Sequence, residues 1–308
     1  MHRFPLFLVA LGLVVGVIAG CDSGGPDRER ALAPGALRPY EGLGTWVDVY
    51  DYVPGFQDPG EPPAVTPASV DDMAALGVRT LYLQAAQDDP RSPDATVDRG
   101  LLGKFLRRAH DHGIEVVAWY VPRLADVNSD LGHVRAIHRF RSHGERFDGL
   151  ALDIEWTKGV PDVEARNAAL VDLSGRVRTL VGEHYALGAI VLEPVFLEVI
   201  SPEYWPSFPW KQVEPQYDVW MPMSYWTNRQ ADSGYREGFK YTAENVRRLR
   251  ADLDDDDAMV HTIGGIGDGA TAADYDGFVR ASREAEALGW SVYDFNTVAT
   301  SAWPRLRG

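Results

Sequence analysis

The stretch Phe147-Asp148-Gly149-Leu150-Ala151-Leu152-Asp153-Ile154-Glu155-Trp156 has the pattern of a buried β-strand that ends in two carboxylates. Side chains two apart on a strand point to the same face, so Asp153 and Glu155 share one face. The opposite face carries Leu152 and Ile154, which suit a core. A buried carboxylate without a partner is energetically expensive, so plain core does not explain the pair. The stretch therefore predicts a strand with a functional site at its carboxyl end.

Eight short apolar runs of this kind recur along the chain. We expect them to be strands, at Thr45–Tyr52, Arg79–Gln84, Glu115–Val121, Gly149–Glu155, Ala186–Leu192, Asp218–Tyr225, Met259–Gly264 and Ser291–Thr297. Between them lie longer stretches with apolar residues three and four positions apart, which is the spacing of an amphipathic helix. Eight strand–helix units of about thirty residues predict an α/β fold, a single-domain (β/α)8 barrel of the TIM type. The alternative is a doubly wound open sheet.

Polar residues gather where the predicted strands end, and barrel active sites lie at that end. Besides the two acids above, they include Asp48, Gln84, Glu193, Tyr225, Asp294 and Asn296. We expect them to line one pocket. For Asp48 and Asp294 the alternative is a role in capping strand ends, and for Glu193 it is a place in a loop held by Pro194.

The paired acids suit glycoside hydrolysis, which needs a carboxylic acid to protonate the leaving oxygen. We expect Glu155 to donate this proton. Asp153 would stay ionised deeper in the barrel and raise the pKa of Glu155. The alternative is a structural ion pair with an arginine across the barrel. The seventh predicted strand contains no glutamate, which argues against a nucleophilic glutamate there.

Two tryptophans directly follow strands that carry site residues. Trp156 follows Glu155, and Trp226 follows Tyr225. Sugars present apolar C–H faces that pack on aromatic rings, so we expect both tryptophans to bind substrate. The alternative for each is packing in the core.

The run 148–155 resembles the fourth-strand motif of family 18 glycoside hydrolases, the chitinase-type barrels, whose pattern is D-G-x-D-x-D-x-E. The resemblance covers Asp148, Asp153 and Glu155, and it implies that Glu155 is the acid. It also implies that the acetamido group of the sugar acts as the nucleophile. The run 218–225 resembles the sixth-strand motif M-x-Y-D of that family, which implies that Tyr225 supports the acetamido oxygen.

The chain departs from the family 18 pattern at two positions, because Ala151 and Trp226 stand where the family has aspartates. A second resemblance joins Asp48, Asp153, Glu155 and Asp294 to the acids of family 25 lysozymes, which cut peptidoglycan. A third group, the poorly characterised glycoside-hydrolase-like barrels, is also similar in outline.

The first 21 residues have the pattern of a bacterial lipoprotein signal peptide: a short basic start, an apolar stretch, and Ile-Ala-Gly before Cys21. Cys21 is the only cysteine, so we expect it to be lipidated. The alternative is an ordinary secretory signal followed by an unrelated cysteine. Residues 22–40 are small, polar and rich in Pro and Gly, as in a flexible tether. The barrel would then span residues 41–308.

Charge and composition argue against some classes of ligand. The net charge of −15 argues against nucleic acid, which needs a basic surface. The histidines lack zinc-site spacing, and the acidic run 252–257 lacks the glycine and distal glutamate of an EF-hand, so we expect no metal or other cofactor.

The sequence thus predicts an extracytoplasmic glycoside hydrolase on the cell membrane, anchored only through its lipid and acting on polysaccharide or peptidoglycan-type glycan. One alternative is a glycan-binding barrel that has lost catalysis, as Ala151 and Trp226 would suggest. Another is a cell-envelope assembly factor that uses the barrel surface.

Overall fold

The structure is a computed structural model that describes residues 31–92 and 94–307. The predicted signal peptide, Cys21 and residues 22–30 lie outside the described residues.

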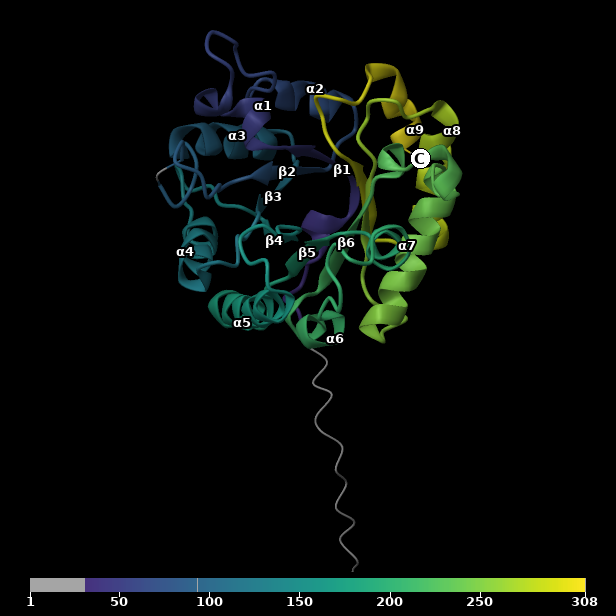
Figure 1. The fold of residues 1–308 in the computed structure, drawn as a ribbon. Helices are drawn as coiled ribbons and strands as arrows, with labels where there is room; N and C mark the ends of the chain where they lie inside the picture. Colours follow the sequence, from purple (N-terminus) through teal and green to yellow (C-terminus); the bar gives the residue numbers. More distant parts are fainter. Residues whose placement is uncertain (1–30, 93, 308) are drawn as a thin grey trace, which may run out of the picture. The chain divides into compact units, whose positions relative to one another are not determined.

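Eight parallel strands close into a barrel in chain order (Figure 1). They are β1 (Gly42–Val47), β2 (Thr80–Gln84), β3 (Glu115–Tyr120), β4 (Gly149–Ile154), β5 (Leu187–Val191), β6 (Val219–Ser224), β7 (His261–Gly264) and β8 (Gly289–Val292). β1 pairs with β2 and also with β8, through Gly42 opposite Gly289, and this last pairing closes the ring. The predicted (β/α)8 barrel is confirmed, and the open sheet is excluded.

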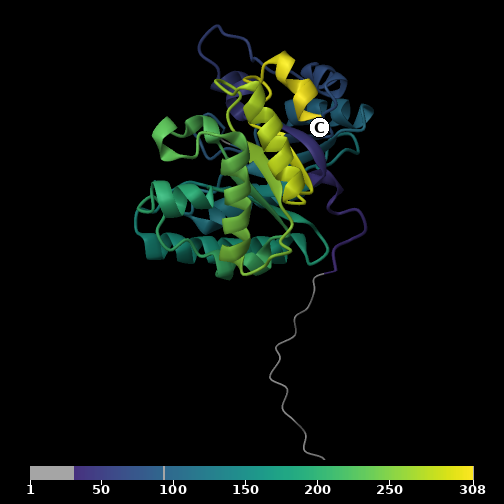
Figure 2. The same cartoon turned by 90° about the vertical axis from the view of Figure 1, so that its right-hand side faces the viewer.

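Helices surround the barrel on its outside (Figure 2). They are α1 (Val49–Tyr52), α2 (Ser69–Ala75), α3 (Arg99–Asp111), α4 (Val127–His138), α5 (Val163–Val181), α6 (Trp210–Val213), α7 (Gly238–Leu253), α8 (Ala272–Glu284) and α9 (Trp303–Leu306). α7 and α8 pack side by side. Several helices begin at a side chain that accepts backbone N–H groups of the first turn, such as Asp126 before α4 and Asp162 before α5. Within the described residues no helix has the length and apolar character needed to cross a membrane.

The first strand is shorter than the sequence predicted. It ends at Val47, because Asp48 caps the short helix α1 and forms a capping box with Asp51. The predicted continuation to Tyr52 is therefore wrong. The eighth strand likewise ends at Val292 and not at Thr297.

Tyr40 closes the amino end of the barrel. Its side chain is fully buried, and its hydroxyl donates to the Leu150 carbonyl at 2.7 Å. Gly149 and Gly188 leave room for its ring, since a Cβ on either would lie about 3 Å from Tyr40 atoms. Tyr40 belongs to a short 3₁₀ turn, Arg38–Tyr40. The folded unit therefore begins before residue 41, and the predicted tether ends too late.

Aromatic and polar side chains fill the barrel interior above Tyr40. Trp46 stacks on Tyr82 with ring centroids 4.3 Å apart, and its indole donates to Ser291 Oγ at 2.8 Å. His261 Nε2 lies 3.0 Å from the same Oγ, and its Nδ1 lies 2.8 Å from the Tyr40 carbonyl. A carbonyl only accepts, so Nδ1 carries the proton and Nε2 accepts from Ser291. Trp46, Ser291, His261 and Tyr40 thus form one connected set of buried hydrogen bonds.

Candidate active site

The carboxyl ends of the strands surround a cavity of about 310 Å³, which we call the mouth cavity. Its walls come from the ends of six of the eight strands and the loops that follow them. The lining residues are Asp48, Tyr50, Gln84, Gln87, Trp119, Val121, Arg123, Asp153, Glu155, Trp156, Met223, Tyr225 and Tyr293. Its position matches the usual place of active sites in this architecture.

Asp153 and Glu155 lie together in the mouth cavity, as predicted. Asp153 is only 7% exposed, and its Oδ1 has no hydrogen-bond partner in the part of the chain that the structure describes. Within residues 31–92 and 94–307, neither carboxylate forms a hydrogen bond or an ion pair with a basic side chain. The predicted alternative of a structural pair with arginine is therefore not what the structure shows.

The pKa is raised at both acids, and not at Glu155 alone as the sequence predicted. Burial, and then the charge of Glu155, raise the pKa of Asp153 well above its usual value. Burial also raises the pKa of Glu155, against the opposing charge of Arg123. Two adjacent buried carboxyls resist losing both protons, so the pair retains a shared proton.

Two tyrosines line the cavity together with the acids, one after β6 and one after β8. Tyr225 follows β6, and burial raises its pKa well above its usual value, so its hydroxyl keeps its proton and is a hydrogen-bond donor. Tyr293 follows β8 with its ring 6.0 Å from that of Tyr225, and its hydroxyl donates to Asp48. The other oxygen of Asp48 accepts the first backbone N–H groups of α1. Asp48 therefore lines the cavity as predicted, but both of its oxygens are already engaged.

Trp156 also lines the cavity as predicted, but a cation covers one face of its ring. The guanidinium carbon of Arg123 lies 3.8 Å from the ring centroid, within the range of cation–π contacts. Sequence reasoning missed Arg123 and Gln87. The sequence does contain a signal for Arg123, because this residue lies just after the carboxyl end of the third predicted strand. The other predicted site residues also lie at strand ends of this kind.

Four predicted substrate-binding residues do not line the mouth cavity. Trp226 is fully buried, with its ring 5.3 Å from Phe278 in the core, which confirms the alternative prediction for it. Glu193 is buried behind Tyr225 and accepts its backbone N–H at 3.3 Å, with Arg229 at 3.9 Å. The remaining two are Asp294 and Asn296, which turn toward α1.

Asp48, Asp51 and Asp294 place one oxygen each within 4.8 Å of one another. Burial, and then repulsion from the neighbouring Asp48 and Asp294, raises the pKa of Asp51 to about 7. Tyr293, Asn296 and the backbone N–H of Thr297 donate hydrogen bonds to the three acids. The raised pKa of Asp51, which favours its protonated form, and these hydrogen-bond donors therefore reduce the repulsion between the three carboxylates.

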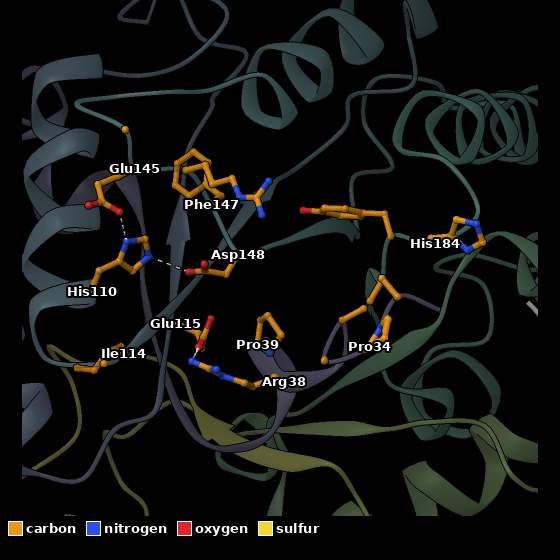
Figure 3. Close-up of a pocket in the computed structure, with 18 residues that line it drawn as sticks. Pro34, Arg38, Pro39, His110, Ile114, Glu115, Glu145, Phe147, Asp148 and His184 are labelled. Atoms are coloured by element: carbon orange, nitrogen blue, oxygen red, sulfur yellow. Dashed lines mark hydrogen bonds and ion pairs between the residues drawn. The ribbon is translucent and has the colours of Figure 1, made fainter. Parts of the chain in front are cut away.

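A larger cavity, of about 720 Å³, lies at the opposite end of the barrel (Figure 3). Five of its ionisable groups are paired with one another. His110 bridges Glu145 and Asp148 at 2.5 and 2.9 Å, and Arg38 pairs with Glu115. Asp148 and then Glu145 hold the pKa of His110 at about 9. Asp148, part of the family 18 resemblance, thus serves the amino end of β4. We assign the chemistry to the smaller mouth cavity, because its acids are unpaired.

Neither a family model nor a curated protein matches the sequence. Solved structures do match over most of the chain. A class V chitinase from Pseudomonas fluorescens Pf-5 aligns with a TM-score of 0.60 at 11% identity, covering 87% of this chain and 98% of that one. An endo-β-1,4-mannanase from Thermotoga petrophila gives 0.62 at 9% identity, covering 87% and 75%.

The spore cortex-lytic enzyme SleL of Bacillus megaterium QM B1551 aligns with a TM-score of 0.56 at 9% identity, covering 86% of this chain and 73% of that one. At these identities the likeness shows the fold alone. The chain has the (β/α)8 barrel that these glycan-cleaving proteins also have.

Proposed function

We propose that this protein is a glycoside hydrolase that acts on a polysaccharide or a cell-wall glycan, with Glu155 as the proton donor. One observation carries the proposal: the buried Asp153 and the half-buried Glu155 meet in a cavity at the carboxyl end of the barrel, and neither has an ion-pair partner among residues 31–92 and 94–307. Acid chemistry at neutral pH needs a carboxyl that keeps a proton, and burial supplies this property.

In the proposed reaction a sugar entering the cavity excludes water from Glu155. The proton shared with Asp153 then moves to Glu155, which passes it to the glycosidic oxygen as the C–O bond breaks. Ionised Asp153 stabilises the positive charge that develops on the sugar. The Tyr225 hydroxyl donates a hydrogen bond to the substrate.

The nucleophile does not come from a second free carboxylate in the described lining. The remaining acid there is Asp48, and Tyr293 and the start of α1 engage both of its oxygens. Either water attacks the sugar and passes its proton to ionised Asp153, or a substituent of the substrate attacks in its place. The second possibility agrees with the family 18 resemblance, in which an acetamido group does so.

The compared structures support a glycan as substrate, since they are described as a chitinase, a mannanase and a spore cortex-lytic enzyme. The lining tryptophans and tyrosines also suit sugar binding, and they argue against a purely structural assembly factor. We further propose that Cys21 anchors the protein to the outer face of the cell membrane through lipid. Retention of a Cys21→Ser variant in the membrane fraction would contradict this anchor.

The substitution Glu155→Gln tests the proposal. The amide keeps the shape of the side chain but has no acidic proton, so kcat should fall by about 10² to 10⁴ with little change in KM. Hydrolysis would be measured on chitin oligosaccharides, mannan and peptidoglycan. Glu203→Gln, the same change at an exposed loop position, is the control and should retain full activity.

Full turnover by the Glu155→Gln variant would exclude Glu155 as the acid. The second candidate function is a glycan-binding barrel without catalysis. It is favoured by Ala151 and Trp226, which are buried where the resembling family has acids. Binding of these glycans by the wild-type protein without any cleavage would support it.

A further inference from the structure

Arg123 is the cation that the mouth cavity presents to a ligand. It follows β3 after Val121 and Pro122, and it lines the same cavity as Glu155. Its guanidinium carbon lies over the Trp156 ring, 3.8 Å from the ring centroid, and Lys158 Nζ lies 5.7 Å from the same centroid.

The local structure holds Arg123 in place before any ligand arrives. Its backbone N–H donates to Asp130 Oδ1 at 2.9 Å, and its Nη2 donates to the Asp88 carbonyl at 3.1 Å. Gly159 packs closely on its backbone, since a Cβ there would lie 2.2 Å from the Arg123 carbonyl oxygen. A guanidinium held in this way loses little freedom when it binds a partner.

Arg123 has no carboxylate in ion-pair range among residues 31–92 and 94–307. The acid that contacts its backbone is Asp130, and both oxygens of Asp130 already accept hydrogen bonds. Oδ1 accepts from the Tyr120 hydroxyl and the Arg123 N–H, and Oδ2 accepts from the Leu124 N–H. The Nε and Nη1 groups of Arg123 have no acceptor within the same described part of the chain. Nη2 gives one of its two hydrogens to the Asp88 carbonyl. Its other hydrogen forms a planar fork with either Nε or Nη1, and such a fork matches a carboxylate in two parallel hydrogen bonds.

The position of Arg123 is not explained by a favourable effect on the pKa of Glu155. The positive charge of Arg123 lowers the pKa of Glu155 and so opposes the burial that keeps Glu155 protonated. A proton donor gains nothing from such a neighbour. An anion bound to Arg123 would cancel that charge and favour the protonated form of Glu155. The paired acids still hold a shared proton, which limits their repulsion of such an anion.

We propose, on the basis of the proposed function, that Arg123 selects a sugar that carries a carboxylate as the substrate of this site. The carboxylate pairs with the guanidinium over Trp156, beside the bond that Glu155 protonates. It can belong to the ring, as in a uronic acid, or to an ether substituent, as in a lactyl group.

The test compares pairs of tetrasaccharides that differ only in the carboxyl group. One pair contains glucuronate or its carboxyl-reduced form. The other contains alternating N-acetylglucosamine and N-acetylmuramic acid, or its carboxyl-reduced form. Calorimetric titration of the full-length protein should show about tenfold to hundredfold tighter binding of the acidic member of at least one pair. The pair that shows the preference identifies the source of the carboxylate.

In the Arg123→Gln variant the affinity for the acidic member should fall to that for its neutral counterpart, and Arg123→Lys should retain part of the preference. Arg91→Gln removes an exposed arginine paired with Asp89 outside the cavity, and it should leave the preference intact. Thermal unfolding of each variant checks that it is folded.

Equal binding of both members of each pair by the wild type, or an unchanged preference in Arg123→Gln, would overturn the assignment. The same holds if neither acidic tetrasaccharide binds. These outcomes are separate from the Glu155→Gln experiment: hydrolysis of a neutral glycan that depends on Glu155 would leave the proposed function standing while the assignment of Arg123 fails.

Discussion

The coupling between Asp153 and Glu155 decides what this site can do at a given pH. Asp153 is buried and Glu155 is half-buried, and within the described residues neither forms an ion pair, although the charge of Arg123 acts on Glu155. Their last shared proton is lost only when pH rises past a strongly raised pKa. The alkaline limb of the activity profile therefore reports the pair and not one residue.

Replacing Asp153 with Asn should move that alkaline limb to lower pH. Without the neighbouring negative charge, Glu155 loses its proton more readily, while Arg123 still favours its ionised form. Asp48 and Tyr225, which also face the cavity, are unchanged in this variant. The pH dependence of kcat/KM on a cleaved glycan measures the shift. An unchanged limb would show that Asp153 does not influence the acid.

At the scale of elements, the turn before β1 connects several strands of the barrel through hydrogen bonds. Tyr40 accepts the Leu150 N–H and donates to the Leu150 and Ala186 carbonyls, so it joins the amino ends of β4 and β5. It also provides the carbonyl that accepts from His261. The barrel therefore depends on residues that the sequence places in a tether.

Tyr40→Ala should lower the free energy of unfolding by about 3–5 kcal/mol, because it leaves a cavity between two strands. Tyr40→Phe should cost only about 1–2 kcal/mol, the value of the lost hydrogen bonds. Urea denaturation at pH 7 measures both. Tyr204→Ala, at a residue that is 43% exposed, is the control and should change stability little. A Tyr40→Ala protein as stable as the wild type would contradict the role of this turn.

At the scale of the whole molecule, the core histidine makes stability depend on pH. His261 is fully buried among β7, β8 and Tyr40, and burial lowers its pKa to about 4. An exposed histidine in the unfolded chain has a pKa of about 6.5. As pH falls from about 6.5 to 4, His261 becomes protonated in the unfolded chain but stays neutral in the folded protein. Stability from this group is present above pH 6.5 and is lost toward pH 4.

The loss amounts to about 3 kcal/mol over that range. In His261→Asn this component is absent, so the difference in unfolding free energy between wild type and variant should narrow as pH falls from 7 to 4. Other ionisable groups are common to both proteins and cancel in the difference. His143→Asn, at an exposed position, should show a constant difference. A constant difference for His261→Asn as well would refute the pKa of about 4.

The sequence by itself determined the barrel and the place of its acids. Apolar runs such as Leu150–Ile154 can be recognised from neighbouring residues alone. A strand with both faces buried is typical of a parallel sheet that helices cover. The two-residue spacing of Asp153 and Glu155 then places both on one face, whatever surrounds the strand. Tyr225 and Trp156 were found in the same way, from their positions at strand ends.

Only the tertiary structure decided which strand-end side chains meet. Trp226 turns into the core against α8, Asp294 joins Asp48 and Asp51 beside α1, and Arg123 faces Glu155 from a different strand. Beyond the last ladder hydrogen bond, a side chain no longer follows the strand alternation. Its direction then depends on the helices and loops packed against it, and these come from distant parts of the chain.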